Sequence, residues 1–441
     1  MTSREWSRAD NGRLPLNESQ TWNECQIRRL LGMLAARSLF RVEILVLLFH
    51  GPVSHWAMPA DIGDRGDQAD LIKYIGSSAM GQGDLLARTE AEREIWRKLM
   101  APLWEQEAPA MHGRGVIIVG GRNSDGSPRP YYTLDGLLTI AALRWSGCSL
   151  PVELWHDHDP ALRRLTVADA LWDSNVTLRD FWDLPGGEDL GGWQLPSMAL
   201  LYSEFAEALY IDADNVPLMD PTLLFEGTAF RRAGAVFWPD LDLWYYQNPM
   251  WSVASRNFIE SPGTESGQIL VNRSKRGVMV ALALGHHFNC RGPEFYYGMF
   301  YGNKELWRFA WLALRQPHVL VPRLPDVVGF LADGGQAFCG HTLLQREPSA
   351  QRPAFAHRVM HKLSMALEKD GPSWTAIKVW TERSSRAHAS KKCRLHERVI
   401  GFDIDEDLKS SPEDERLLWH LLAMERDLLL LRSLIANNNS E

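Results

Sequence analysis

The sequence lacks an apolar run long enough to cross a membrane as a helix. Its most apolar early stretch, residues 39–49, is interrupted by Arg41 and Glu43, whereas a spanning helix needs about 20 apolar residues. The first 20 residues are polar, so no signal peptide is evident. We interpret residues 39–49 as a buried or interfacial segment and expect any membrane association to depend on an N-terminal segment that is not evident here.

Cysteine is scarce, and basic residues are not in excess. The five cysteines form no C-x-x-C pair, which argues against a cysteine-based zinc site, and their odd number implies at least one free thiol or an intermolecular partner. Lys and Arg number 47 against 55 Asp and Glu, for a formal net charge of −8. Because nucleic-acid binding depends on a basic face, we expect no nucleic-acid partner.

The composition is that of an ordinary globular protein. Of the 441 residues, 45% are hydrophobic and 23% are charged, which excludes a disordered or collagen-like chain. We predict three regions: a polar N-terminus with a helical extension over residues 1–110, a catalytic domain over 111–365, and a helical extension over 366–441.

Short apolar runs alternate with helical patterns through residues 113–211. Residues 116–119 form a continuous apolar run closed by Gly120 and Gly121, which is typical of a buried parallel strand that enters a tight turn. Further strands are expected over 151–155 and 208–211, and helices over 134–145 and 198–207. This alternation predicts an α/β fold with a parallel sheet. A last amphipathic helix is expected to begin at Ser411 and Pro412.

Two carboxylates, Asp212 and Asp214, directly follow the third predicted strand. The carboxyl end of a parallel strand is a ligand-binding edge, and Mg²⁺ or Mn²⁺ prefers oxygen ligands. Such a D-x-D motif can hold a cation that stabilises a departing diphosphate. The same letters also fit an aspartate-nucleophile phosphatase of the haloacid-dehalogenase type, with Asp212 as nucleophile and Asp214 as acid and base. That motif normally opens its domain, whereas about 100 residues of α/β pattern precede it here.

Two histidine pairs receive simpler interpretations. His156 and His158 alternate with aspartates, as a metal site would, but we favour a solvated loop. His286 and His287 follow an apolar helical pattern and are expected at the surface or at a helix end.

Eight blocks of sequence follow one another through residues 113–362. They are residues 113–121, 143–155, 203–217, 220–225, 234–240, 265–270, 302–304 and 355–358. Together they resemble the fungal Golgi α-1,2- and α-1,3-mannosyltransferases (glycosyltransferase family 71). The resemblance implies a GT-A-type, Rossmann-like nucleotide-sugar domain, GDP-mannose as donor, Mn²⁺ (or Mg²⁺) as metal, and a glycan or glycoprotein acceptor. It also implies a retaining reaction and a location in the Golgi lumen or membrane.

The resemblance assigns roles to individual residues. Asp212 and Asp214 match the family's D-x-D motif, His357 is the expected third metal ligand, and His341 is the second candidate for that position. The other expected site residues are the catalytic candidates Glu265, Gln268 and Asp240 and the donor-binding candidates Gly120, Gly121, Arg122, Trp238 and Lys304. Glu265 or Gln268 would face the anomeric carbon, and Trp238 and Asp240 would line the sugar pocket, although packing is the favoured explanation for Trp238. Retention can proceed on the front face or through a covalent intermediate, and the sequence leaves both open.

Two departures from the family pattern leave another function open. The segment around Pro196 carries no lysine before the next helix, and Asn303 stands where the family tends to carry aspartate. A non-catalytic relative that binds a glycan or nucleotide is therefore the alternative hypothesis.

Overall fold

The computed structural model describes the chain in eleven segments. They are residues 82–106, 109–122, 128–159, 162, 175–300, 302–332, 337–359, 362–363, 373–378, 400–403 and 412–438. The expectations for residues 1–81 lie outside the described residues. No helix in the described segments is long and apolar enough to span a bilayer.

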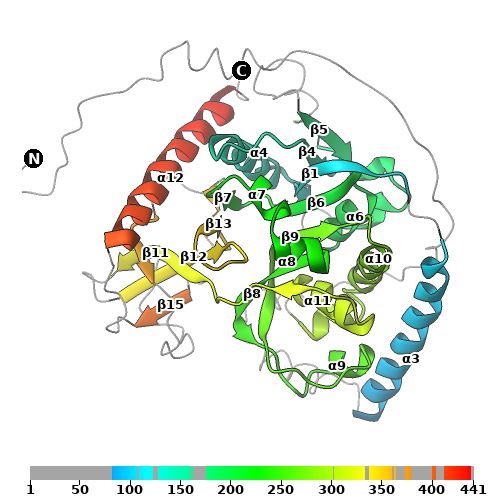
Figure 1. The fold of residues 1–441 in the computed structure, drawn as a ribbon. Helices are drawn as coiled ribbons and strands as arrows, with labels where there is room; N and C mark the ends of the chain where they lie inside the picture. Colours follow the sequence, from blue (N-terminus) through cyan, green and yellow to red (C-terminus); the bar gives the residue numbers. More distant parts are fainter. Residues whose placement is uncertain are drawn as a thin grey trace, which may run out of the picture.

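A seven-stranded mixed sheet forms the centre of the fold (Figure 1). In spatial order its strands are β10 (Val319–Leu320), β8 (Ala235–Leu243), β9 (Pro262–Asn272), β6 (Phe205–Asp212), β1 (His112–Val119), β4 (Val152–His156) and β5 (Val176–Asp180). The strands from β6 to β5 are mutually parallel, whereas β9 runs antiparallel to both β6 and β8. The predicted α/β class with a parallel sheet region is confirmed.

Helices cover both faces of this sheet. The longer ones are α3 (Gln82–Met100), α4 (Pro130–Trp145), α6 (Leu195–Tyr202), α10 (Arg276–Cys290), α11 (Lys304–Ala313) and α12 (Pro412–Asn438). Short α-helices are α7 (Thr222–Phe225), α8 (Thr228–Ala233) and α9 (Met250–Val253). Single 3-10 turns are η2 (Ala101–Trp104), η3 (Phe181–Asp183), η4 (Gly187–Asp189), η5 (Gly192–Gln194) and η6 (Tyr296–Gly298).

Strand β1 shows why a continuous apolar run becomes a central strand. Val116 and Ile118 point into the core on the side of α4, while Ile117 and Val119 point into the core on the side of α6, α10 and α11. Side chains alternate across a strand, so a strand covered on both faces needs apolar residues at every position. The observed burial explains the sequence pattern that identified this strand.

The helix predicted over residues 198–207 is shorter than expected. It ends at Tyr202, Ser203 is already extended, and β6 begins at Phe205. Phe205 pairs with His112 and Glu207 with Arg114 in the parallel ladder between β6 and β1. The prediction was wrong for 203–207 because strand pairing outweighs the local helical pattern.

A second, antiparallel sheet was not predicted. It contains β14 (Ala376–Lys378), β11 (Asp326–Ala332), β12 (Ala337–Arg346), β13 (Pro353–His357) and β7 (Asn215–Pro217), and β15 (Ile400–Asp403) pairs with β12. A separate pair joins β2 (Gly121–Arg122) to β3 (Pro128–Arg129). Because β7 follows β6 after two residues, the two large sheets meet at the turn that contains Asp214.

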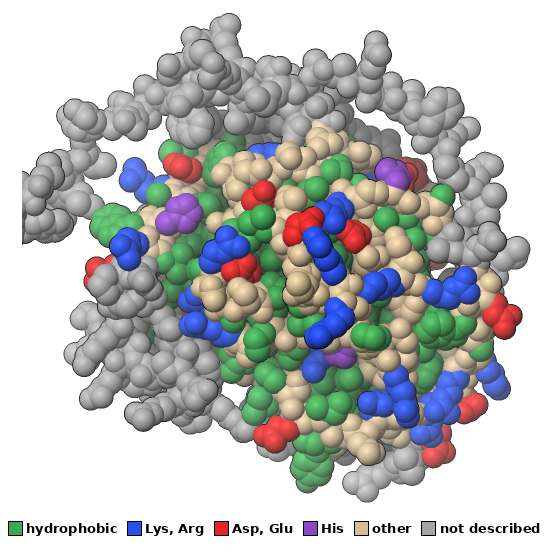
Figure 2. All heavy atoms as spheres, viewed as in Figure 1, with side chains coloured by type: hydrophobic (Ala, Val, Ile, Leu, Met, Phe, Trp, Pro, Cys, Tyr) green, Lys and Arg blue, Asp and Glu red, His purple; other side chains and the backbone are tan. Residues whose placement is uncertain are grey.

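The C-terminal helix packs as its pattern predicts. Leu421 and Leu428 of α12 are fully buried in one apolar cluster with Leu138 and Ala142 of α4, and the two helices lie side by side in Figure 1. Besides this helix, residues 366–441 contribute β14 and β15 to the second sheet. On the face shown in Figure 2, acidic and basic side chains are interspersed.

The expected helix-end position of His286 and His287 is confirmed, since both lie near the C-terminal end of α10, but the surface alternative was wrong. Both are buried in α10, with 5% and 6% of their surface exposed. Burial lowers the pKa of each to about 4, so both imidazoles are neutral at pH 7. The predicted free thiols are present at Cys148 and Cys290.

Candidate metal centre at the junction of two sheets

The carboxylates of Asp212 and Asp214 flank the turn that links the two sheets. Asp212 ends β6 beside Val119 of β1, and Asp214 precedes β7. The backbone of this turn is held on two sides, because Ala213 O accepts from Thr139 Oγ1 at 2.6 Å and Asp214 O accepts from Arg358 N at 3.0 Å. The turn therefore presents both carboxylates from a fixed backbone.

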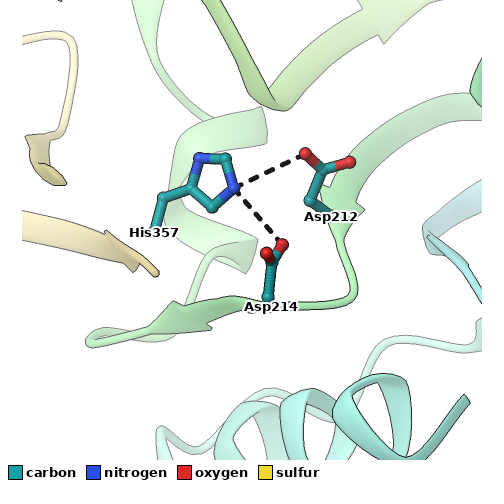
Figure 3. Close-up of side chains that lie close together, drawn as sticks. All are labelled: Asp212, Asp214 and His357. Carbon is teal, nitrogen blue, oxygen red and sulfur yellow. Dashed lines mark ion pairs between the residues drawn. The ribbon is translucent and has the colours of Figure 1, made fainter. Parts of the chain in front are cut away.

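His357 completes the cluster from the second sheet. It ends β13, where it pairs with Asn215 of β7. Its Nε2 lies 3.3 Å from Asp214 Oδ1 and 3.6 Å from Asp212 Oδ2 (Figure 3). One ligand atom from each residue lies within 4.8 Å of the others, and no other such group of three occurs among the described residues. The three side chains expected to bind metal are thus brought together.

Glu265 of β9 orients the histidine ring. Its Oε1 accepts from His357 Nδ1 at 3.0 Å and from Gly267 N at 2.7 Å. An ionised carboxylate can only accept here, so Nδ1 carries a proton, and Nε2 is the ring nitrogen that faces the two aspartates and could bind a cation. A carboxylate behind a histidine is a recurrent arrangement in metal sites.

Gly267 lets the ring approach this closely. A Cβ atom at this position would lie 2.4 Å from His357 Nδ1, far inside van der Waals contact. Asn215 Nδ2 donates to Gly267 O and to Gln268 Oε1, both at 2.7 Å, which anchors the segment to β7. Gln268 itself is fully buried, beside Ile211 in the ladder.

Opposing charges set the electrostatics of the cluster. Burial lowers the pKa of His357, but the adjacent Glu265 outweighs it, with help from Asp212, so the net shift is upward. Burial raises the pKa of Glu265, and His357 outweighs that effect, so the net shift is downward. Burial raises the pKa of Asp212 despite the nearby His357. Tyr210 Oη donates to Asp212, and Lys362 pairs with Asp214.

A second charged pair lies close to this cluster. Lys304 Nζ, at the start of α11, contacts Asp240 Oδ2 at 2.5 Å and Asp242 Oδ2 at 3.5 Å. Burial disfavours the charged lysine, but the carboxylates of Asp240, Asp242 and Glu305 together outweigh burial and raise the pKa of Lys304. The charge of Asp240 also contributes to the raised pKa of His357, so this carboxylate acts electrostatically on the cluster.

The remaining donor-binding candidates lie at the same sheet or within it. Gly120 follows β1, its N–H donates to Trp155 O at 2.8 Å, and a Cβ on it would lie 3.2 Å from Thr133 Oγ1. Trp238 is fully enclosed, and its Nε1 donates to Arg346 O at 2.7 Å, so its observed role is packing. The side chain of Arg122 lies outside the described residues.

His341, the second choice for the third metal ligand, lies elsewhere. Its Nε2 is 3.3 Å from Ser373 O and its Nδ1 is 2.9 Å from Thr342 Oγ1, deep in the second sheet. His341 is thus not part of the cluster with Asp212 and Asp214, because its ring nitrogens are directed at Ser373 and Thr342. Of the two departures, Pro196 lies in the first turn of α6 and Asn303 immediately precedes Lys304, with Nδ2 donating to Trp193 O at 3.0 Å.

The predicted solvated loop is confirmed for His158, which is exposed, and was wrong for His156, which ends β4 and is buried. His156 is 4% exposed, and His158 Nδ1 lies 3.0 Å from Asp180 Oδ2 at the end of β5. The His158 ring stacks on Trp182 with centroids 4.7 Å apart. Both histidines face the buried carboxylate of Asp180 on a neighbouring strand, which the local sequence does not reveal.

Sequence reasoning missed the residues that support the ligands. Tyr210 and Asp212 are two positions apart on one strand, and such residues share a face, so this contact could have been found. Glycine at 267, two residues after Glu265, signals close backbone approach. The roles of Lys362 and Arg358 depend on pairings between distant segments and left no local signal.

Comparisons with known proteins show the family of this chain. A family model described as mannosyltransferase matches residues 113–258 and 247–347. The Alpha-1,2-mannosyltransferase MNN24 of Candida albicans is 28% identical over 229 residues, covering 43% of this chain and 30% of the relative. The Candida albicans MNN2 is 24% identical over 353 residues (66% and 56%), and the Saccharomyces cerevisiae MNN2 is 25% identical over 293 residues (55% and 47%). The chain thus spans 30% to 56% of the length of these relatives.

The similarity to solved structures is weaker. The glycosyltransferase GlyE of Streptococcus pneumoniae TIGR4 shares 12% identity at a TM-score of 0.32, over 48% of this chain and 46% of that one. The galactosyltransferase LgtC, in complex with donor and acceptor sugar analogues, shares 11% identity at 0.31, over 47% and 73%. These likenesses are too weak to assign an activity.

Proposed function

The chain belongs to the mannosyltransferase family whose model matches residues 113–347, and from this membership we propose that it transfers mannose from GDP-mannose to a glycan or glycoprotein acceptor. The observation that carries the proposal is the cluster of Asp212, Asp214 and His357 at the carboxyl end of β6. Residues 111–365 are proposed as the catalytic unit, and a Golgi location follows from the family resemblance.

The cluster fits a divalent cation by its chemistry. Two carboxylate oxygens and one imidazole nitrogen form a donor set suited to Mn²⁺ and, with less preference for nitrogen, to Mg²⁺. The side chain of Asp212 is 30% exposed, whereas those of Asp214 and His357 are 3% and 8% exposed. The open side at Asp212 supports access of a ligand to the ion. A bound cation would supply Lewis-acid stabilisation of the departing diphosphate.

The protein's own groups would set the geometry of the reaction. Glu265 holds the Nδ1 proton of His357 and so keeps Nε2 directed at the aspartates. Tyr210 restrains Asp212 by a hydrogen bond. We propose that Asp240, oriented by Lys304, faces the sugar and that Gln268 supports Asn215 behind the turn. Transfer would keep the α configuration of the donor.

The nucleoside end of the donor would extend along the same edge of the sheet. Ligands bind at the carboxyl ends of parallel strands, and β4 lies two strands from β6, about 10 Å away at the usual strand spacing. Gly120 lies between them at the end of β1. The exposed ring of Trp182, stacked on His158, offers a planar surface for a base.

The decisive experiment measures release of GDP from GDP-mannose with and without Mn²⁺, in the presence of mannose-terminated acceptors. Asp212→Ala and Asp214→Ala should lower turnover by about 100-fold or more. Asp427→Ala, which removes an exposed carboxylate of α12, should match the wild type.

Other outcomes favour the alternatives. Turnover equal to that of the wild type in the Asp212 and Asp214 variants would rule out a metal bound by these two carboxylates. Nucleotide binding without turnover on any acceptor would favour a non-catalytic relative. Hydrolysis of a generic phosphoester that is lost in Asp212→Asn would favour a phosphatase.

A further inference from the structure

A buried ion pair connects the candidate metal centre to the C-terminal helix. Arg358, the residue after His357, contacts Glu425 of α12 with Nη1 and Oε1 2.5 Å apart. Both side chains are 1% exposed. The chain between them includes the segment at residues 373–378, which also joins the contact.

The carboxylate of Glu425 has all of its hydrogen-bonding capacity in use. Its Oε2 accepts from Ser373 N and Trp374 N, both at 2.8 Å, and its Oε1 accepts from Ser373 Oγ at 2.7 Å. Arg358 Nη2 donates to Ser373 Oγ at 3.1 Å, and its guanidinium lies 5.0 Å from the centroid of the Trp374 ring. Each charged group is therefore held in one orientation.

This network reaches the metal ligands through the backbone. Arg358 N donates to Asp214 O at 3.0 Å, so the residue that contacts α12 also ties the end of β13 to the D-x-D turn. The same helix packs on α4, and Thr139 of α4 donates to Ala213 O at 2.6 Å. The route through Arg358 ends at His357, whereas the apolar packing on α4 ends at Ala213, which is not a candidate ligand.

We propose that Glu425 is a positioning residue of the metal centre: through Arg358 it sets where His357 Nε2 lies relative to Asp212 and Asp214. The inference rests on the proposed metal-dependent function. A buried ion pair is weak evidence for a purely stabilising role, because apolar residues of similar volume often serve stability as well. A metal site instead demands ligand positions within about 0.2 Å, which an orienting network of charged hydrogen bonds can impose.

The test compares Mn²⁺ affinity, measured by titration calorimetry without any donor, across matched variants of the full chain. Glu425→Gln should weaken Mn²⁺ binding about 10-fold or more, as loss of an outer-shell partner does. It should also reduce the ¹⁴N coupling from His357 in the spin-echo spectrum of bound Mn²⁺. Because Glu425→Gln leaves a buried charge and can unfold the protein, Arg358→Lys is the second variant: it keeps the charge but cannot bridge Glu425 and Ser373 together.

Leu428→Ala is the control for helix stability. It removes a fully buried side chain of α12 three residues from Glu425, so it should lower the melting temperature and leave Mn²⁺ affinity and the ¹⁴N coupling as in the wild type. Wild-type affinity in folded Glu425→Gln and Arg358→Lys would overturn the inference, as would an equal loss in Leu428→Ala. Failure of the wild type itself to bind Mn²⁺ would instead overturn the proposed function, and the inference with it.

Discussion

Replacing Gly267 by alanine should disable the metal centre while leaving the fold in place. The new Cβ would lie 2.4 Å from His357 Nδ1 and 2.7 Å from Cε1, whereas real Cβ contacts are essentially never under 3.0 Å. The ring must therefore move by at least about 0.6 Å, roughly three times the tolerance of a metal-ligand distance. The hydrogen bond to Glu265 lies on the same side of the ring and would be disturbed as well.

The expected loss of Mn²⁺ affinity is 10-fold to 100-fold, or about 1.4 to 2.8 kcal/mol. Overpacking should also lower the free energy of unfolding by about 1–3 kcal/mol, which a domain of this size can tolerate. Titration calorimetry with Mn²⁺ measures the first quantity, and chemical denaturation measures the second.

Gly285→Ala is the matched control. This glycine is buried in α10, and its added Cβ would lie 3.2 Å from the side chain of Trp307. Gly285→Ala therefore adds a similar steric clash at a site outside the metal cluster. The free energy of unfolding should fall slightly, and Mn²⁺ affinity should not change. A folded Gly267→Ala protein that binds Mn²⁺ as tightly as the wild type would show that His357 is not a ligand.

Three further predictions concern the surrounding structure. Burial lowers the pKa of His287 to about 4, below its unfolded value, so its contribution to stability is complete above pH 6.5 and is lost as pH falls toward 4. In urea unfolding, the free energy of unfolding should fall less between pH 7 and pH 5 in His287→Gln than in the wild type. An equal fall in both proteins would contradict the lowered pKa of His287. Trp238→Phe removes the hydrogen bond from Nε1 to Arg346 O and should lower the free energy of unfolding by about 1–3 kcal/mol. The KM for donor should not change, and a raised KM would place this ring in the sugar pocket. Lys304→Met should lower the free energy of unfolding by about a few kcal/mol, because it leaves the buried Asp240 unpaired. The variant should also have a raised KM for donor. Wild-type kinetics in a folded variant would exclude a role for Lys304 in donor binding.

Local patterns predicted the elements whose environment is uniform. The strand over residues 116–119 is apolar at every position because both faces of β1 are covered. Four consecutive apolar residues are therefore enough to predict this strand. Asp212 and Asp214 were found because a strand and its following turn are contiguous in sequence. The final helix was found because one stripe of leucines packs on α4.

Elements that depend on distant partners were misjudged. Residues 203–207 have a helical sequence pattern, yet residues 205–207 pair with β1 as part of strand β6. His286 and His287 are polar residues, but the fold buries both in the neutral form. The antiparallel second sheet joins β7 to strands more than 100 residues later in the chain, and no local period records such a pairing.

The amino-acid sequence alone therefore determined the α/β class, the family resemblance and the two aspartates, since each of these is written in short contiguous segments. Only the tertiary structure decided between His357 and His341, assigned Glu265 to the far side of the histidine ring, and joined α12 to the site through Arg358 and Glu425. The physical reason is that a metal centre needs several ligands at one point, and the chain brings them together only by pairing strands and helices that are remote in sequence.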